Sequence, residues 1–541
     1  MHERVCLIVL GLCVAMAAGE ARAQDAMESS EPSSEVAAEY VARPDGVATT
    51  YHVVRMRGED VPYEAQAGMM PLVDGEGEIE ARMFYIAYRR LRMPQAQWER
   101  ERSAHVQRTG SEEGFEPNRL DPRTRPITFS FNGGPGSSSV WLHLGVFGPK
   151  RVAYADEIGN PGPPPYFVVD NDDSLLGVSD FVFLDPVSTG FSRAEEAGGE
   201  KAFHGVESDI ESVAEAIRLY LSREGRWASP KFIAGESYGT TRAAGLSEHL
   251  LTEHGIALNG AVLVSSVMNF ATLRFDVGND LPYPLFVPTM AATAHFHEAL
   301  DAEARARTLE AHVAQAERYA MERYLPALAK GARLDAGERE RIAAELSELI
   351  GISAKEILDA NLRVGMPMFS KALLRDRGQT VGRLDSRFTA VDRLRAGDSY
   401  EFDASYEAIR GNYTGSLNAY VRDELGYESD LPYEILTNVW PWSFEPAGSN
   451  RYLNVAERLR SAMARQPWMR VYIASGYFDL ATPHFATDYT VDQLELPDDL
   501  RANIETLYYP SGHMMYVHGP SLRAMRDDLV SFYERTPRRE P

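Results

Sequence analysis

A strand-like segment that runs directly into a Gly-x-Ser-x-Gly turn constrains the fold of this chain more than any other feature. Residues 231–234 are mostly apolar, Gly-Glu-Ser-Tyr-Gly follows at 235–239, and a helical pattern continues through Ala243 and Leu246. Small residues around a serine allow a strand to reverse tightly into a helix and leave the hydroxyl exposed at the end of a sheet. The alternative is an ordinary glycine turn. The flanking strand and helix favour a nucleophile turn centred on Ser237.

Short apolar strands alternate with helical patterns on both sides of this turn. Residues 210–221 carry apolar side chains at helical spacing, and runs of β-branched or aromatic residues at 51–56 and 83–89 predict the antiparallel strands of a first meander. The alternation predicts a mixed, mostly parallel central sheet flanked by helices. With the serine turn, it indicates the α/β-hydrolase fold. The strand candidates of the parallel part are 127–131, 181–184, 232–234, 261–265 and 471–474.

A stretch of the chain, 275–426, interrupts this alternation. Asp335 followed by Glu338 resembles a helix start, and Ile342, Leu346 and Leu349 then form an apolar stripe at helical spacing. Ser353 and Glu356 repeat the same start signal. We therefore expect a helical cap inserted between two parts of the hydrolase body, which would be 51–274 and 427–541.

The N-terminal residues predict export. Residues 5–18 are apolar, Arg4 precedes them, and Ala-Arg-Ala at 21–23 offers a cleavage site, so 1–23 is expected to be a signal peptide. An uncleaved anchor is the alternative, although the run is shorter than the roughly 20 residues that span a bilayer. Residues 24–50 are rich in Glu, Ser, Ala and Pro and predict a disordered linker.

Charge and cysteine content narrow the setting. The formal net charge is −24, which argues against nucleic acid or an anionic membrane as the main partner. The two cysteines, Cys6 and Cys13, both lie in the expected signal peptide, so the mature chain would hold no disulfide, thiolate metal site or catalytic cysteine. We expect a periplasmic or secreted protein, with a bacterial periplasm favoured, and no lasting membrane contact after signal cleavage.

A serine hydroxyl needs a histidine to take its proton and a carboxylate to orient that histidine. In proteins with this turn, the partners follow in the order Ser, Asp or Glu, His. Asp479 follows the strand candidate 471–474, and His513 lies on a glycine-marked loop after a further strand. His484 is too close to Asp479 to leave a strand between them, and His518 directly precedes the last helix. Ser237, Asp479 and His513 are therefore the predicted catalytic triad.

A glycine-rich segment supplies the expected oxyanion hole. Asn-Gly-Gly-Pro-Gly-Ser-Ser at 132–138 follows a strand, and adjacent glycines let backbone N–H groups approach a ligand closely. Proteins with this turn use the N–H after the nucleophile and one from such a loop, here Tyr238 and Gly134. The segment lacks the Gly-Lys-Ser/Thr ending of a phosphate-binding loop. No metal or organic cofactor is expected.

Four sequence blocks resemble the serine carboxypeptidase family. They are the glycine block at 132–136, Pro-Val-Ser-Thr-Gly-Phe-Ser at 186–192, the nucleophile motif at 235–239 and Gly-His-Met at 512–514. The resemblance implies an exopeptidase that acts on peptide or protein C-termini through an acyl-enzyme. It also implies that Asn132, Gly133 and Glu236 bind the terminal carboxylate of the substrate.

The chain departs from the family at positions that bear on carboxylate recognition. Ser130 stands where a tryptophan is common, and Val146 stands where an acidic residue usually pairs with the glutamate, here Glu236. Ser137 replaces a half-cystine. A glutamate donates a hydrogen bond to a carboxylate only when it is protonated, so an acidic pH optimum for peptides is expected.

Two other functions remain open at this point. An esterase or acyltransferase would use the same acyl-enzyme chemistry on the same scaffold, and a non-catalytic binding protein could retain the fold. The sequence has no His-Glu-x-x-His, which disfavours a metallopeptidase. Thr240 stands three residues after the serine, where a penicillin-binding transpeptidase has lysine.

Overall fold

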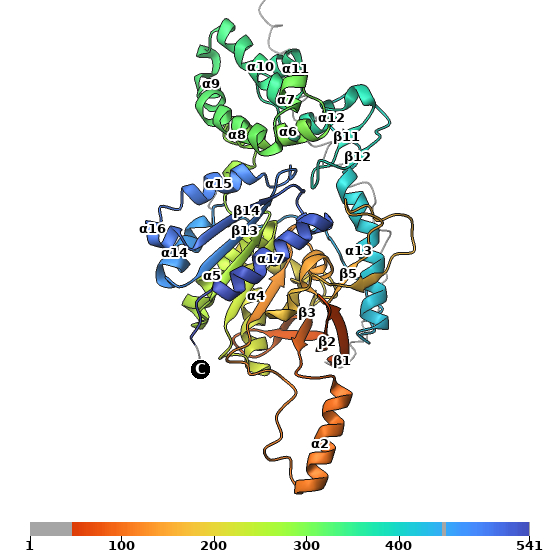
Figure 1. Cartoon of the computed structure of the whole chain (residues 1–541). Coiled ribbons are helices and arrows are strands. Elements are labelled where there is room, and N and C mark those ends of the chain that lie inside the picture. The colour runs from red at the N-terminus through yellow and green to blue at the C-terminus, as the bar shows by residue number, and fades with distance from the viewer. Residues whose placement is uncertain (1–45, 446–450, 540–541) are drawn as a thin grey trace, which may run out of the picture. The chain divides into compact units, whose positions relative to one another are not determined.

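The computed structural model describes residues 46–445 and 451–539. Its main element is a ten-stranded sheet in the order β1-β2-β3-β7-β4-β9-β10-β13-β14, with β8 paired to β3 (Figure 1). The strands from β1 to β7 pair antiparallel, and those from β7 to β14 pair parallel. The predicted mixed, mostly parallel sheet is confirmed. The strands are β1 Ala48–Met56, β2 Glu59–Val73, β3 Ile79–Arg90, β4 Ile127–Phe131, β7 Asp180–Leu184, β8 Arg193–Ala194, β9 Lys231–Glu236, β10 Gly260–Val264, β13 Arg470–Gly476 and β14 Ile504–Tyr509.

Alternating side chains of the central strands feed two apolar cores, one on each face of the sheet. In β9, Ile233 packs into one core, whereas Phe232 and Ala234 pack into the other. The first core also takes residues from several helices, and the second takes residues from the C-terminal helix. Burial on both faces explains why these strands are continuous apolar runs. The helices include α4 Val206–Arg223, α5 Tyr238–His254 and α14 Ala456–Arg465 on the first face, and α17 Gly519–Arg535 on the second.

The sheet begins earlier than the sequence predicts. Strand β1 starts at Ala48, which pairs with Ala67 of β2, so the last residues of the predicted linker 24–50 belong to a strand. Alternating exposed and partly buried side chains in β1 hid this strand among polar residues. The predicted signal peptide, 1–23, and most of the linker lie outside the described residues.

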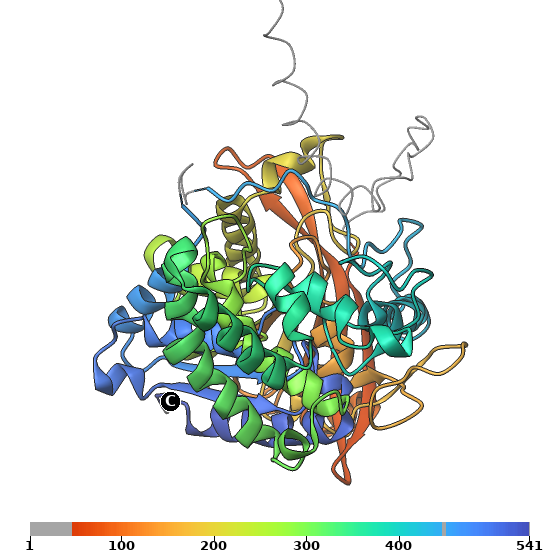
Figure 2. The same ribbon diagram turned by 90° about the horizontal axis from the view of Figure 1, so that it is seen from above.

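The insertion carries a helical core of its own. Its helices pack around a third apolar cluster that includes Ile342, Leu346 and Leu349. The predicted helix start is confirmed, because the Asp335 side chain accepts a hydrogen bond from the Glu338 N–H at 2.9 Å. Figure 2 shows these helices, in green, grouped together in the view from above. They are α6 Pro282–Phe296, α7 Ala302–Arg305, α8 Leu309–Tyr319, α9 Leu325–Lys330, α10 Ala336–Ile350, α11 Ala354–Asp359 and α12 Met366–Ala372.

The last helix of the interval 275–426 packs with the sheet instead of with these helices. Two short strands, β11 Thr380–Val381 and β12 Thr389–Ala390, lead to helix α13, Ala404–Asp423. Tyr413 and Leu417 of α13 belong to the core on the α17 face of the sheet. The sequence defined one cap because it shows where the strand alternation stops, but not which core each later helix enters. Among the described residues, no helix combines the length and the apolar character needed to cross a membrane.

Candidate active site

Ser237 lies where β9 reverses into α5. Its backbone has a φ of 59° and a ψ of −128°, a conformation that residues other than glycine rarely adopt. Its N–H donates to the carbonyl of Val264, the last residue of β10, at 3.0 Å. The side chain of Ser237 is only partly buried. The sheet therefore holds this serine in a strained turn at the carboxyl ends of its parallel strands.

His513 and Asp479 meet at the same edge of the sheet. Asp479 follows β13, and His513 follows β14. Nδ1 of His513 donates to Oδ2 of Asp479 at 2.7 Å, and both residues are buried. This hydrogen bond fixes the ring and leaves Nε2 as the nitrogen that can exchange a proton. The structure thus brings together the predicted base and its orienting carboxylate.

The environment of His513 favours its protonated form. Burial alone would lower the pKa of this imidazole, but the charge and hydrogen bond of Asp479 raise it above its usual value. The carboxylate of Glu236 adds to that increase. A histidine with a raised pKa is a stronger base toward a serine hydroxyl.

Two residues that no sequence motif marks hold Asp479 and His513 in place. Thr482 donates through Oγ1 to Asp479 Oδ2 at 2.7 Å, and its N–H donates to Asp479 Oδ1 at 3.0 Å. Ser265, just after β10, donates through Oγ to the His513 carbonyl at 2.6 Å. Both are common residue types without a motif, so only the folded chain identifies them.

The glycine-rich loop approaches the first turn of α5 very closely. A Cβ atom on Gly133 would lie 2.4 Å from the backbone nitrogen of Tyr238, so a side chain there would cover that N–H. As the first residue of α5, Tyr238 has no acceptor for its N–H within the helix. Gly134, next along the loop, has a φ of 100°. The two predicted oxyanion donors therefore come from segments in direct contact.

A buried ion pair supports this loop. Arg242 of α5 binds Asp209 of α4 through two hydrogen bonds of 2.8 and 3.0 Å. Its Nη1 also donates to the carbonyl of Asn132 at 2.6 Å. The guanidinium lies 5.6 Å from the ring centre of Tyr238. The sequence gives no signal for Arg242 and Asp209, because the pairing joins two helices without a shared motif.

Glu236, directly before the serine, is a buried carboxyl beside the triad. Burial raises its pKa to about 7, against opposing effects from His513 and from the hydroxyl of Tyr516. Tyr516 donates to Glu236 Oε2 at 2.5 Å. The buried side chain of Asn132 lies beside the same carboxyl, where its hydrogen bond favours the charged form of Glu236. The site thus combines a protonatable carboxyl with the buried amide of Asn132 beside it.

The positions where the chain departs from the family are also buried. Val146 lies in the apolar core on the α17 face. Glu236 instead accepts a hydrogen bond from Tyr516, which lies three residues after His513. Ser130 is fully buried and its hydroxyl has no partner.

The remaining late histidines have other partners. His484 begins α15, His484–Asp492, and its Nε2 lies 3.1 Å from Glu317 Oε1. His518 contacts Ser521 through Nδ1. In the described part of the chain, Glu317, His484 and Asp488 form one group whose ligand atoms lie within 4.8 Å of one another, the spacing of a possible metal site. None of the three belongs to the predicted triad.

The strand order, the turn at Ser237 and the sequence order of the serine, aspartate and histidine make this chain an α/β-hydrolase. The sequence model of the serine carboxypeptidases matches residues 114–514, and the chain belongs to that family of serine hydrolases. The resemblance seen in the four sequence blocks is therefore confirmed.

Solved structures give a weaker likeness. A peroxisomal α/β-hydrolase of Saccharomyces cerevisiae is 10% identical, with a TM-score of 0.34 over 89% of this chain and 92% of that one. A monoglyceride lipase of the same yeast is 9% identical, with a TM-score of 0.33 over 87% and 96%. Scores this low say nothing about the activity of this chain. The comparison with curated proteins returns no match.

Proposed function

We propose that this protein is an exported serine carboxypeptidase that releases C-terminal residues from peptides through an acyl-enzyme. Membership of the family supports the reaction class. The observation that carries the exopeptidase assignment is the buried, protonatable Glu236 beside His513 and Asp479. A neutral carboxyl at this place can donate a hydrogen bond to the terminal carboxylate of a substrate, which a charged one would repel.

In the proposed reaction, Ser237 Oγ attacks the carbonyl carbon of the last peptide bond while His513 Nε2 takes its proton. Asp479 holds the imidazole and stabilises its charge. The N–H groups of Gly134 and Tyr238 bind the oxyanion, and each such donor is typically worth about 3 kcal/mol in barrier height. Collapse of the intermediate transfers the proton from His513 to the leaving amine. Water then hydrolyses the acyl-enzyme by the same steps.

The substrate carboxylate would bind Asn132, the backbone of Gly133 and protonated Glu236. The position of the buried Asn132 side chain beside Glu236 supports this assignment, because an amide and a protonated carboxyl can both donate hydrogen bonds to one carboxylate. Protonation of Glu236 also removes a charge that raises the pKa of His513. The form that binds substrate therefore also favours the neutral imidazole that catalysis needs. Both effects point to peptidase activity on the acid side of neutral.

The departures at Ser130 and Val146 keep an esterase or acyltransferase as the second candidate. Both residues differ from the family at positions that bear on the terminal carboxylate, while the proposed acyl-enzyme machinery does not depend on either. A binding protein without catalysis is the third candidate. It is disfavoured because the His513–Asp479 hydrogen bond and the strained turn at Ser237 are both present.

The test is mass spectrometry of N-blocked peptides incubated at pH 5 with wild type, Ser237→Ala and Ser222→Ala. Ser222 is an exposed serine near the end of α4 and serves as the control. Stepwise loss of C-terminal residues in wild type and Ser222→Ala, abolished in Ser237→Ala, is the expected result. If the peptides survive but a chromogenic ester is cleaved by a Ser237-dependent reaction, the esterase or acyltransferase replaces the carboxypeptidase. If neither the peptides nor the ester react, the result favours the non-catalytic binding protein.

A further inference from the structure

A short segment of the insertion returns to the two loops that carry His513 and Asp479. It lies between β11 and β12 and consists of residues 383–387, Arg-Leu-Asp-Ser-Arg, which we call the clamp segment. The segment lies inside the predicted helical cap, and no sequence motif marks it. Its hydrogen bonds reach both sides of the triad.

The clamp segment holds the histidine loop through two backbone N–H groups. The N–H of His513 donates to the Leu384 carbonyl at 2.6 Å, and the N–H of Gly512 donates to Asp385 Oδ2 at 3.2 Å. The clamp segment and the histidine loop are so close that a Cβ on Gly512 would lie 2.4 Å from the Cβ of Asp385. The position of His513 is therefore tied to Leu384 and Asp385 at the backbone.

The same segment holds the turn that carries Asp479. The N–H of Ser386 donates to the carbonyl of Phe478, and the N–H of Leu480 donates to the carbonyl of Arg383, each at 3.0 Å. These two hydrogen bonds hold Phe478 and Leu480, the residues on either side of Asp479. One segment thus fixes both partners of the proposed Asp479–His513 pair relative to each other.

An ion pair makes the clamp segment rigid. Arg387 binds both oxygens of Asp385, with Nε 3.0 Å from Oδ1 and Nη2 2.6 Å from Oδ2. Arg387 also donates to the hydroxyl of Ser511 at 3.0 Å and to the carbonyl of Pro510 at 3.2 Å. Both side chains are buried, which makes a pair of this geometry strongly directional. Arg387 therefore orients Asp385 and the histidine loop together.

The helices of the insertion anchor the clamp segment. In α6, Thr293 Oγ1 lies 2.6 Å from Ser386 Oγ, and His297, which directly follows α6, donates through Nε2 to the Ser386 carbonyl at 2.7 Å. At the start of α13, Ser405 Oγ accepts the Leu384 N–H at 3.0 Å. The insertion is thereby connected to the triad through hydrogen bonds at every step.

We propose that the clamp segment sets the geometry of the catalytic pair, with Asp385 and Arg387 as positioning residues. This inference rests on the proposed function, because it concerns the same His513 and Asp479. Misplacement of a reacting group by about 1 Å can cost about 100-fold in rate, so loosening the clamp lowers turnover without touching the substrate. Substrate affinity depends on other residues and changes little.

The test compares Asp385→Asn with Asp392→Asn. Asp392 is an equally buried carboxylate of the same insertion, and its partners are Lys371 and the N–H of Glu401. We expect Asp385→Asn to lower kcat for an N-blocked peptide, and the rate of Ser237 labelling by a small fluorophosphonate, by about 10- to 100-fold. KM should stay within about twofold of wild type. Asp392→Asn should keep wild-type values of all three at a temperature well below its Tm.

A second substitution covers the case in which Asp385→Asn does not fold. Arg387→Lys keeps the charge but cannot form the two-pronged bond and reach Ser511 and Pro510 as well. It should lose less activity than Asp385→Asn, again in kcat. Equal kcat and labelling rates in the clamp and Asp392 variants would overturn the inference. Failure of the proposed function looks different, since wild type itself would then leave the peptide intact, with Ser237 still labelled if the protein is an esterase or acyltransferase and unlabelled if it is a binding protein.

Discussion

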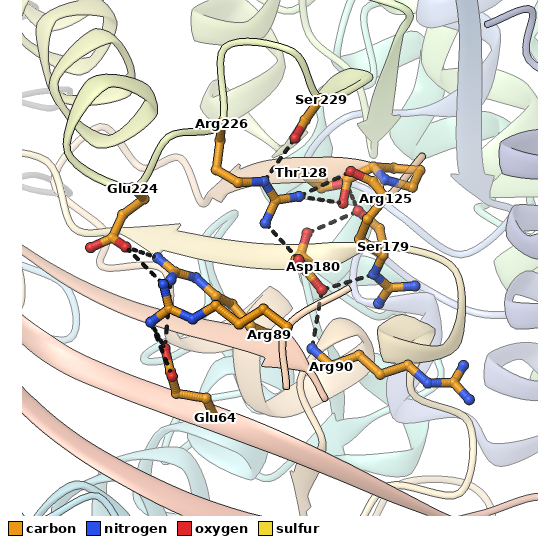
Figure 3. Close-up of polar contacts among 12 residues, drawn as sticks. Glu64, Arg89, Arg90, Arg125, Thr128, Ser179, Asp180, Glu224, Arg226 and Ser229 are labelled. Atoms are coloured by element: carbon orange, nitrogen blue, oxygen red, sulfur yellow. Dashed lines mark hydrogen bonds and ion pairs between the residues drawn. The ribbon is translucent and has the colours of Figure 1, made fainter. Parts of the chain in front are cut away.

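Buried carboxyl groups lie at both ends of the parallel strands, but their pKa values are shifted in opposite directions. At the amino ends, Asp180 of β7 accepts hydrogen bonds from Arg125 at 2.8 Å and from Arg226 at 2.6 Å (Figure 3). Burial alone would raise the pKa of Asp180, but the two guanidinium groups hold it below its usual value. Arg89 adds a second buried connection at this end, to Glu224 at 2.5 Å and to Glu64 at 3.6 Å.

At the carboxyl ends, Glu236 of β9 is as buried as Asp180, with exposed fractions of 3% and 4%. Its charged neighbours are His513 and Asp479, and burial raises its pKa to about 7. The two carboxyl groups differ in their partners and not in their burial. Two arginines keep Asp180 charged, so that it stabilises the sheet as a permanent anion. Glu236 has a tyrosine hydroxyl near it instead of an arginine, so that it can titrate in the pH range proposed for the enzyme's activity.

Of the substitutions that test this difference between the two ends, we expect the largest effect from one that removes a catalytic group at the carboxyl ends. Asp479→Asn should lower kcat by about 10⁴-fold, because an amide cannot hold the His513 tautomer and its charge. That loss corresponds to about 5 kcal/mol in the barrier. The measurement is kcat for an N-blocked peptide, with the urea midpoint recorded alongside. Retention of more than a tenth of wild-type kcat would contradict the role assigned to Asp479.

At the amino ends, the expected effect falls on stability instead. Asp180→Ala leaves Arg125 and Arg226 buried without their carboxylate, which should lower the free energy of unfolding by about 3–5 kcal/mol. Arg119→Ala is the control, since Arg119 is half exposed and its bond to Glu64 is worth about 1 kcal/mol or less. Urea unfolding measures both. If Asp180→Ala leaves the free energy of unfolding unchanged but removes activity, the assignment of stability to the amino ends and catalysis to the carboxyl ends is wrong.

The smallest effect is the pH dependence that Glu236 gives to stability. Its folded pKa of about 7 lies above the ordinary value of 4.5, so the folded protein binds this proton more tightly than the unfolded chain. Stability from this group is therefore full below pH 4.5 and declines as the pH rises toward 7, by up to about 3 kcal/mol. Glu236→Gln should abolish that decline. Parallel curves of wild type and variant in urea unfolding from pH 4.5 to 7.5 would contradict the assigned environment.

Asp180 predicts the opposite slope, which serves as the reference for that experiment. Because its folded pKa is depressed, its contribution to stability is present above the unfolded value near 3.8 and is lost as the pH falls through the lower folded value. The two ends of the sheet thus titrate in separate pH ranges and can be measured on one protein.

Local sequence signals predicted much of the fold. The parallel strands, the serine turn, the helix start at Asp335 and the order of Ser237, Asp479 and His513 all follow from short patterns whose physical cause lies within a few residues. The same patterns did not predict two boundaries correctly. They placed the start of β1 too late, and they assigned α13 to the cap although it packs against the sheet.

The sequence by itself determined the family, the sheet and the residues proposed for the reaction, because a tight turn, a capped helix and an apolar strand each need particular residues at fixed spacing. Only the tertiary structure decided which groups surround them. Tyr516 reaches Glu236 across 280 residues, and Arg387 reaches Ser511 across 124. Such contacts leave no periodic trace in the sequence, and burial together with charged neighbours, which set the pKa of a carboxyl, exists only after the chain has folded.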